Sequence, residues 1–334
     1  MNARRLRRYR LTLVLASVVL LAVAPMGAVG QHTPVQRVSW SDVATIDLAD
    51  FNKDLVAGRP TMDVAIYIPS NFDPAFNKLT LEQMLSSVRS AKEIYGRVGV
   101  QINLLSVRTG AIDPRFLAIQ SNEIPRLPDT EYLNTYEASQ RHPTVMTDMA
   151  KAAFESIVEP FADNRRTIYL VALQDVIYPY LELSEGRNWT VKMVRTGGLS
   201  FSSYSYHTTI PDRLRGVITI TNLSTPGRLR RTVAHELGHK VMNVSHEYKT
   251  TAPAFEVHAA GGLMLYGDGE DIPAGADGRW HLERLLLSPY IYTLDAEGRK
   301  VWNPDYREGG HYYDPIYGEK AVRFPGRIAM DPDW

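Results

Sequence analysis

The chain has 334 residues, of which 44% are hydrophobic and 22% charged, a composition that fits one large globular domain or two modest ones. Its 37 Lys and Arg residues balance 37 Asp and Glu residues, and this lack of a basic excess argues against a nucleic-acid-binding protein. The chain contains no cysteine, which excludes disulfides, a cysteine nucleophile and thiolate metal ligands.

The N-terminus has the arrangement of an export signal. The first ten residues are rich in arginine without any acidic residue, and an unbroken apolar run follows over residues 11–24. This run is shorter than the roughly 20 residues of a membrane span and suits a signal peptide. Ala28 and Gly30 supply the small residues that predict cleavage after Gly30. We therefore expect residues 1–30 to be a signal peptide, of the general secretory or the twin-arginine type, and the mature protein to be secreted or periplasmic. An uncleaved signal anchor is the alternative, and would be the protein's attachment to a membrane.

Strands and helices alternate after a polar lead-in or pro-segment, residues 31–60, that lacks clear periodicity. Alternating or short apolar runs rich in β-branched and aromatic residues predict strands, and apolar residues at helical spacing predict helices. The proline-rich segment 108–143 is predicted to be loop. The predicted strands cover 62–69, 100–107, 166–173, 198–206 and 216–221, and the predicted helices cover 79–95 and 144–158.

A third helix is predicted over residues 226–242. Thr225 occupies the capping position and Pro226 the first helical position. Asn243 follows, and asparagine can adopt the left-handed conformation that ends a helix. The basic residues of the first turns are interpreted as a solvated face: Arg228, Arg230 and Arg231.

The last third of the chain is rich in glycine turns and then contains a short predicted helix near 281–287 and a hairpin that turns at 295–298. The order of elements predicts an α+β fold with a mixed, twisted sheet. We expect one catalytic domain over residues 61–290, and a C-terminal hairpin and aromatic tail over residues 291–334.

Residues 235–239 read His-Glu-Leu-Gly-His. On a helix, His235 and His239 lie on the same face, so that both imidazoles can bind one zinc ion. Glu236 beside them can take a proton from a metal-bound water. This spacing predicts a zinc hydrolase in which Glu236 is catalytic.

A catalytic zinc site requires a third protein ligand. The chain turning back at Asn243 could return His246 to the metal. Glu256 is the alternative, since a downstream glutamate is the third ligand in gluzincins such as the thermolysin-like peptidases, and His258 is a reserve ligand.

The stretch HELGHKVMNVSHE resembles the metzincin signature HExxHxxGxxH. Asn243 corresponds to the family's glycine and His246 to its third histidine, both one residue later than the pattern. The spacing from turn to histidine is kept, and Glu247 is similar to the astacin version of the motif. The resemblance implies a metzincin-like fold, with sheet and helices in an N-terminal subdomain, then the zinc helix and a turn-rich C-terminal subdomain.

Residues 262–267 (GLMLYG) resemble the methionine turn that metzincins carry beneath the zinc. The resemblance implies that Met264 packs under the three histidines. It also implies that Tyr266 stabilises the oxyanion formed during peptide hydrolysis. In that family an edge strand before the zinc helix binds substrate in extended form, and residues 198–203 are the expected counterpart.

Together these features predict an exported endopeptidase with one catalytic Zn²⁺ and a protein or peptide substrate. The acidic residues Asp268, Glu270, Asp271 and Asp277 could bind calcium, although they lack the spacing of a known calcium loop. Three other functions stay open: a gluzincin-like peptidase, a non-catalytic binding module on a peptidase scaffold, and hydrolysis of a non-peptide amide.

Overall fold

The computed structural model describes most of the chain that follows the expected signal peptide. All described residues belong to one compact unit, Val35–Trp334. The predicted signal peptide lies outside the described residues. The described residues are 37–73, 75–76, 78–127, 144–160, 165–183, 188–206, 210–244, 246, 262–264, 269, 271–272, 276–305, 311–313 and 321–323.

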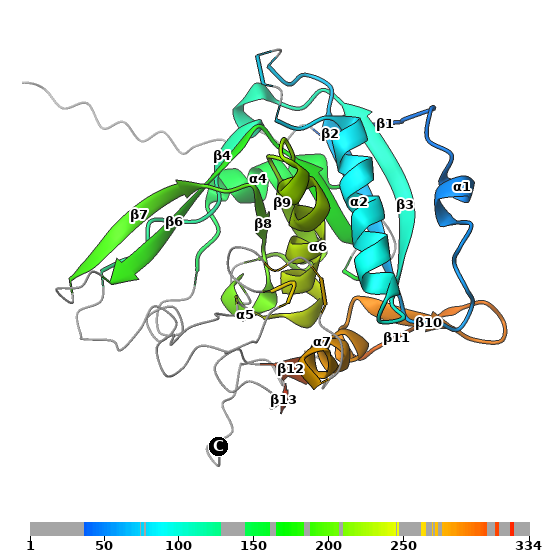
Figure 1. Cartoon of the computed structure of the whole chain (residues 1–334). Coiled ribbons are helices and arrows are strands. Elements are labelled where there is room, and N and C mark those ends of the chain that lie inside the picture. Colours follow the sequence, from blue (N-terminus) through cyan, green and yellow to red (C-terminus); the bar gives the residue numbers. More distant parts are fainter. Residues whose placement is uncertain are drawn as a thin grey trace, which may run out of the picture. The chain divides into compact units, whose positions relative to one another are not determined.

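The fold is built on a mixed sheet of eight strands (Figure 1). Its strands are β1 Ser41–Asp42, β2 Thr61–Pro69, β3 Gln101–Gly110, β5 Ile168–Ala172, β8 Gly198–Ser200, β9 Val217–Ile220, β10 Ile291–Leu294 and β11 Lys300–Trp302. Neighbours follow the order β1-β3-β2-β5-β9-β8, and β10 and β11 extend the sheet from β2. The strands β3, β2, β5 and β9 run parallel, whereas β8 is antiparallel to β9. This arrangement confirms the predicted mixed sheet and the α/β character of the chain.

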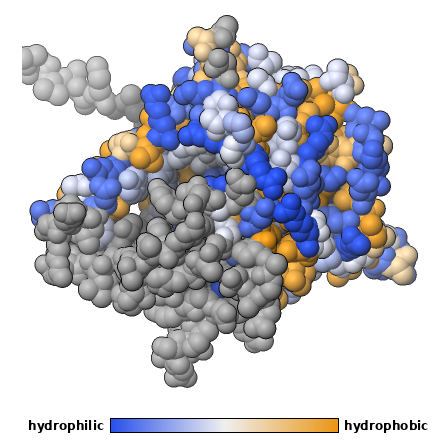
Figure 2. All heavy atoms as spheres, viewed as in Figure 1, coloured by the Kyte–Doolittle hydropathy of each residue, from blue (hydrophilic) through white to orange (hydrophobic). Residues whose placement is uncertain are grey.

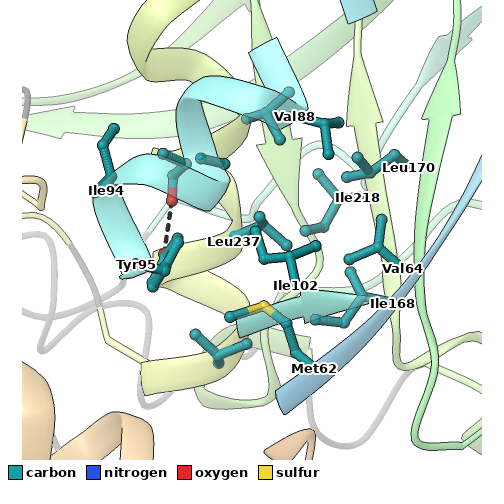
Figure 3. Packing of buried hydrophobic residues seen from close by; sticks show 14 of the residues in the cluster. Met62, Val64, Val88, Ile94, Tyr95, Ile102, Ile168, Leu170, Ile218 and Leu237 are labelled. Carbon is teal, nitrogen blue, oxygen red and sulfur yellow. Dashed lines mark hydrogen bonds between the residues drawn. The ribbon is translucent and has the colours of Figure 1, made fainter. Parts of the chain in front are cut away.

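Two helices pack against one face of this sheet, α2 Leu81–Gly96 and α6 Pro226–Met242. Helix α2 begins with a capping box, in which Thr80 and Gln83 each bond the other's backbone N–H. The Tyr95 hydroxyl donates to the Ala234 carbonyl at 2.8 Å (Figure 3). Because Ala234 directly precedes the His-Glu pair, this buried contact fixes the predicted catalytic helix against α2.

The other face of the sheet is covered by α4 Asp148–Ile157, which Thr147 caps. Phe154 of this helix packs in a second buried cluster with Tyr67 of β2 and Tyr169 of β5. With both faces covered, all nine residues of β2 are buried. Its sequence therefore reads as a nearly continuous apolar run, as expected for a central parallel strand.

A second, three-stranded sheet was not predicted. It consists of β4 Ala118–Gln120, β6 Asp175–Leu183 and β7 Trp189–Arg195, in the order β4-β6-β7. The first of these strands falls in the segment predicted to be loop. Strands β6 and β7 lacked a clear signal because Pro179 interrupts β6 and most of β7 is exposed, which removes the apolar alternation.

The strand predicted over 198–206 is wrong in its second half. Strand β8 ends at Ser200, and a short helix, α5 Ser203–Tyr206, follows. The Phe201 and Tyr206 rings are buried and lie 5.0 Å apart between centroids. Burying both rings in one cluster requires the chain to turn, so tertiary packing overrides the local preference for a strand.

The remaining elements frame the sheet. In the lead-in, α1 Leu48–Asn52 lies against β3 through hydrogen bonds between Asn52 and Leu104. Helix α7 Ala276–Leu287 precedes the predicted hairpin, which β10 and β11 confirm. Strands β12 His311–Tyr313 and β13 Ala321–Arg323 pair with each other. Within the described ranges, no helix is both long and apolar enough to cross a membrane.

Candidate metal centre

The His-Glu-Leu-Gly-His motif lies in the last turns of helix α6, which are buried. Thr225 caps its first turn by accepting a hydrogen bond from Arg228 N, and Pro226 opens the helix as predicted. His235 and His239 lie one turn apart on the same face and are 4% and 7% exposed. The predicted helix and its capping residues are thus confirmed.

Asn243 ends this helix in the left-handed conformation, with φ 53° and ψ 48°. Among the described residues, no other residue except glycine has a positive φ. The turn directs the chain back, so that His246 Nε2 lies 3.1 Å from His235 Nε2 and 3.3 Å from His239 Nε2. The one-residue displacement of the turn relative to the metzincin pattern therefore does not prevent His246 from reaching the other two histidines.

The three Nε2 atoms form a nearly equilateral triangle, since His235 Nε2 and His239 Nε2 are also 3.1 Å apart. Two nitrogen ligands bound at about 2.0–2.1 Å with tetrahedral angles lie about 3.3–3.4 Å apart. The triangle is within a few tenths of an ångström of that spacing. Among the described residues, no other group of three or more His, Asp or Glu side chains is arranged to hold a metal ion.

The outer nitrogens of two rings fix their tautomers. His235 Nδ1 donates to the Leu263 carbonyl and His239 Nδ1 donates to the Val244 carbonyl, each at 2.7 Å. Their Nε2 atoms therefore carry lone pairs that point toward the centre of the triangle. Converging lone pairs in a buried site repel one another unless a cation lies between them, so this arrangement fits a metal ion.

Burial also keeps the three imidazoles neutral. It lowers the pKa of His239 to about 4, and burial together with the neighbouring histidines and Arg231 lowers the pKa of His235 and His246 well below 6.5. Neutral imidazole is the form that binds metal. Protons should therefore compete with the metal only in distinctly acidic solution.

A pH titration of zinc affinity tests this expectation. Three histidines with an ordinary pKa near 6.5 would lose about 10⁴-fold in zinc affinity between pH 7 and pH 5, because each must release a proton. With the pKa values lowered as described, we expect a loss of less than about threefold over that range and a steep loss only below about pH 4. Competition with a chelator of known affinity at each pH measures it; a loss near 10⁴-fold by pH 5 would show that the imidazoles titrate normally.

Glu236, next to His235 on the helix, lies against the edge strand β8. Its carboxylate accepts a backbone hydrogen bond from Ser200, and burial raises its pKa to about 8, a rise that Arg231 and Lys240 partly offset. Gly198 makes this approach possible, because a Cβ there would lie 2.7 Å from Glu236 Cγ. The carboxyl group is thus held against the strand in a state that can both accept and release a proton near neutral pH.

Met264, which the resemblance places under the three histidines, packs against the same helix at Gly238. Its side chain is fully buried, and a Cβ on Gly238 would lie 2.3 Å from Met264 Sδ. The adjacent Leu263 provides the carbonyl that orients His235. Gly238, between the two motif histidines, therefore leaves room for the methionine next to the site.

Lys240 ties the last turn of α6 to the segment after β8. Its Nζ donates to the carbonyls of Phe201 and Arg215, both at 2.6 Å. Ser202 Oγ donates to the His239 carbonyl at 3.0 Å. These buried contacts hold the helix end, and with it the start of the turn to His246, in one position relative to the edge strand.

Arg231 is a site residue that the sequence interpretation missed. It was assigned to a solvated face, but its Nη2 lies 2.9 Å from His235 Nδ1 and 3.4 Å from the Leu263 carbonyl, and its Nε donates to the Gly269 carbonyl. Arg231 thus fastens the segment that orients His235. Its position one turn before His235 on the helix was the available signal.

Replacing Arg231 with glutamine should lower zinc affinity by about 10–100-fold, the usual cost of losing a residue that orients a ligand. The loss arises because the Leu263 carbonyl is no longer held toward His235. A chelator competition titration measures it, with Arg228→Gln as the matched control at the exposed start of the same helix. Equal zinc affinity of the two variants would mean that Arg231 has no part in orienting the site.

The predicted calcium loop contributes one described carboxylate. Asp271 lies 2.9 Å from Arg97 and 3.1 Å from Arg230, so two arginines neutralise it. The side chains of Asp268, Glu270 and Asp277 lie outside the described residues, as do Glu247, Glu256, His258 and Tyr266. The structure therefore brings together four predicted site residues: His235, Glu236, His239 and His246.

Comparison with known proteins adds no relative: no protein-family model matches the sequence, and no curated protein matches it. The three histidines His235, His239 and His246 form a group that could hold a metal ion.

Proposed function

We propose that this protein is an exported, zinc-dependent endopeptidase of the metzincin type. In this proposal His235, His239 and His246 bind the zinc ion and Glu236 is the general base. The observation that carries it is the convergence of three Nε2 atoms at 3.1–3.3 Å from one another, with a buried glutamate on the same helix. A neutral nitrogen donor set with nearly tetrahedral spacing favours zinc among the common divalent ions.

The proposed chemistry divides between the ion and the chain. A zinc ion bound to the three histidines would polarise the scissile carbonyl and acidify a water molecule. Glu236 would accept the proton of the attacking water and deliver it to the leaving amine nitrogen. Its raised pKa, about 8, suits a group that takes up and returns a proton near neutral pH. The hydrogen bond from Ser200 would keep the carboxylate oriented while it does so.

Three features support the metzincin assignment over other zinc hydrolases. The helix ends in a left-handed turn three residues before His246, as the Asn-Val-Ser-His spacing requires. Met264 is buried against the helix beside the motif histidines. The antiparallel edge strand β8 adjoins Glu236, where an extended substrate would bind. Tyr266 completes the proposal as the residue that stabilises the oxyanion.

Metal analysis and proteolysis of the mature chain from Gln31 test this function. We expect about one zinc per chain, cleavage of casein, loss of cleavage when 1,10-phenanthroline removes the metal, and recovery when zinc is returned. Unchanged cleavage by metal-free protein would contradict a metal-dependent mechanism. Zinc binding without cleavage of any protein would instead favour a binding module on a peptidase scaffold. Recovery of the chain outside the cytoplasm tests export.

A further inference from the structure

The β6–β7 hairpin extends beyond the main sheet, and its second strand leads directly into the edge strand next to Glu236 (Figure 1). Of the described residues, only those of β6 pair with β7. The hairpin surface mixes hydrophobic and hydrophilic residues (Figure 2), and Met193 and Val194 of β7 are 48% and 39% exposed. Among the described residues the outer edge of β7 therefore has no strand partner, and it leads to the proposed active site.

The register identifies the backbone groups at this outer edge. Thr196 N donates to Val176 O, so residue 196 faces β6. Hydrogen-bonded and non-hydrogen-bonded pairs alternate along an antiparallel ladder. The backbone N–H and C=O groups of Lys192 and Val194 therefore point toward their partners Tyr180 and Tyr178 in β6. The N–H and C=O groups of Val191, Met193 and Arg195 point outward. Pro179 supports this register, since its missing N–H falls opposite Met193 at a position without a β6–β7 hydrogen bond.

This edge continues into β8 on the same side. Strand β6 follows β5, β7 leads into β8, and β9 lies between β5 and β8 in the sheet. Thr196 relates the two sides, because its N–H donates to Val176 of β6 and its carbonyl accepts from the Thr221 hydroxyl at the end of β9. The side of β7 that faces β6 is therefore the side of β8 that faces β9.

At Gly197 the pairing passes from one partner to the other, because its carbonyl accepts from Thr221 and Asn222 of the β9 end. The backbone groups that point outward belong to Val191, Met193 and Arg195 on β7 but to Gly198 and Ser200 on β8, so the alternation shifts by one residue at Gly197. The outward edges of β7 and β8 therefore follow one another around a bulge and end at Ser200, beside Glu236.

We propose that this edge binds a long extended segment of a protein substrate by strand addition, with β7 as a docking site remote from the bond that is cut. This inference deepens the proposed peptidase function and rests on it. Pairing from Ser200 to Met193, with one partner residue opposite the two residues of the bulge, needs a segment of about seven residues on that side of the scissile bond. The enzyme would therefore favour unfolded or flexible protein segments over short peptides.

Proline at position 193 tests the docking site. Met193→Pro removes an outward N–H and leaves the β6 ladder intact, whereas Met193→Val keeps the N–H and serves as the matched control. For casein, we expect kcat/KM to fall about 3–10-fold in Met193→Pro and to stay unchanged in Met193→Val. A hexapeptide that reaches only β8 should be cleaved equally by both variants and the wild type, which also verifies that the proline variant is folded.

A second measurement leaves the protein unchanged. A 14-residue peptide is compared with the same peptide N-methylated at alternate positions of the half far from the scissile bond, which blocks pairing with β7. We expect the methylated peptide to be cleaved at least about threefold less efficiently. Equal cleavage of casein by all three proteins, together with equal cleavage of the two peptides, would overturn the docking site while leaving the peptidase function intact. If the wild type cleaves neither casein nor peptide, the proposed function fails and this inference fails with it.

Discussion

Replacing Glu236 with glutamine is expected to lower kcat for protein cleavage by about 10³-fold while zinc stays bound, because general-base catalysis typically contributes 10²–10⁴-fold. Glutamine has nearly the same shape, so it still fits between the helix and Gly198. Its amide oxygen can still accept the hydrogen bond from Ser200. The substitution thus removes the proton acceptor and little else. Initial rates on casein and zinc content of the same preparations measure the two effects.

The control for this prediction is Glu82→Gln, on the first turn of α2 and remote in sequence from the motif. It should match the wild type in both activity and zinc content. A Glu236→Gln variant that keeps more than about a tenth of the activity would contradict the role of Glu236 as the base. A variant that loses zinc as well would instead assign Glu236 a structural role in the metal site.

The parts of the site that could be predicted are those determined by local sequence. A capping threonine, a proline at the first helical position and Asn243 delimit α6, and each acts within a few residues of itself. The i, i+4 spacing then places His235 and His239 on one face without any knowledge of the tertiary structure. For the same reason α2, with its capping box and regular apolar spacing, was predicted nearly to its ends.

The parts that could not be predicted depend on contacts between distant segments. Arg231 acts through the carbonyls of Leu263 and Gly269, over 30 residues away, so its position one turn before His235 did not by itself separate a site residue from a solvated one. The close approach of Gly198 to Glu236 joins an edge strand to a helix. Strands β6 and β7 pair mainly with each other and leave β7 largely exposed, so they lack the apolar periodicity that identifies a core strand.

The third ligand is the point at which the sequence left real alternatives, and a pair of variants separates them. His246→Ala should reduce zinc affinity by more than about 100-fold, because even a residue that merely orients a ligand contributes 10–100-fold. Glu256→Ala should bind zinc like the wild type. Competition titrations measure both affinities, and denaturant unfolding of the metal-free proteins checks that neither change acts through loss of the fold.

The end of α6 explains why His246→Ala, and not Glu256→Ala, is expected to lose zinc. Without Asn243 the helix would run on, and one additional residue would rotate the exit direction of the chain by about 100°. The left-handed turn at Asn243 brings His246 Nε2 to within 3.3 Å of both motif histidines. Asn243→Ala, which disfavours that turn, should therefore weaken zinc binding in the same direction as His246→Ala although residue 243 is no ligand. If Glu256→Ala loses zinc and both changes at the helix end leave it bound, the ligand set is that of a gluzincin, and the convergence of the three imidazoles does not describe the metal-bound protein.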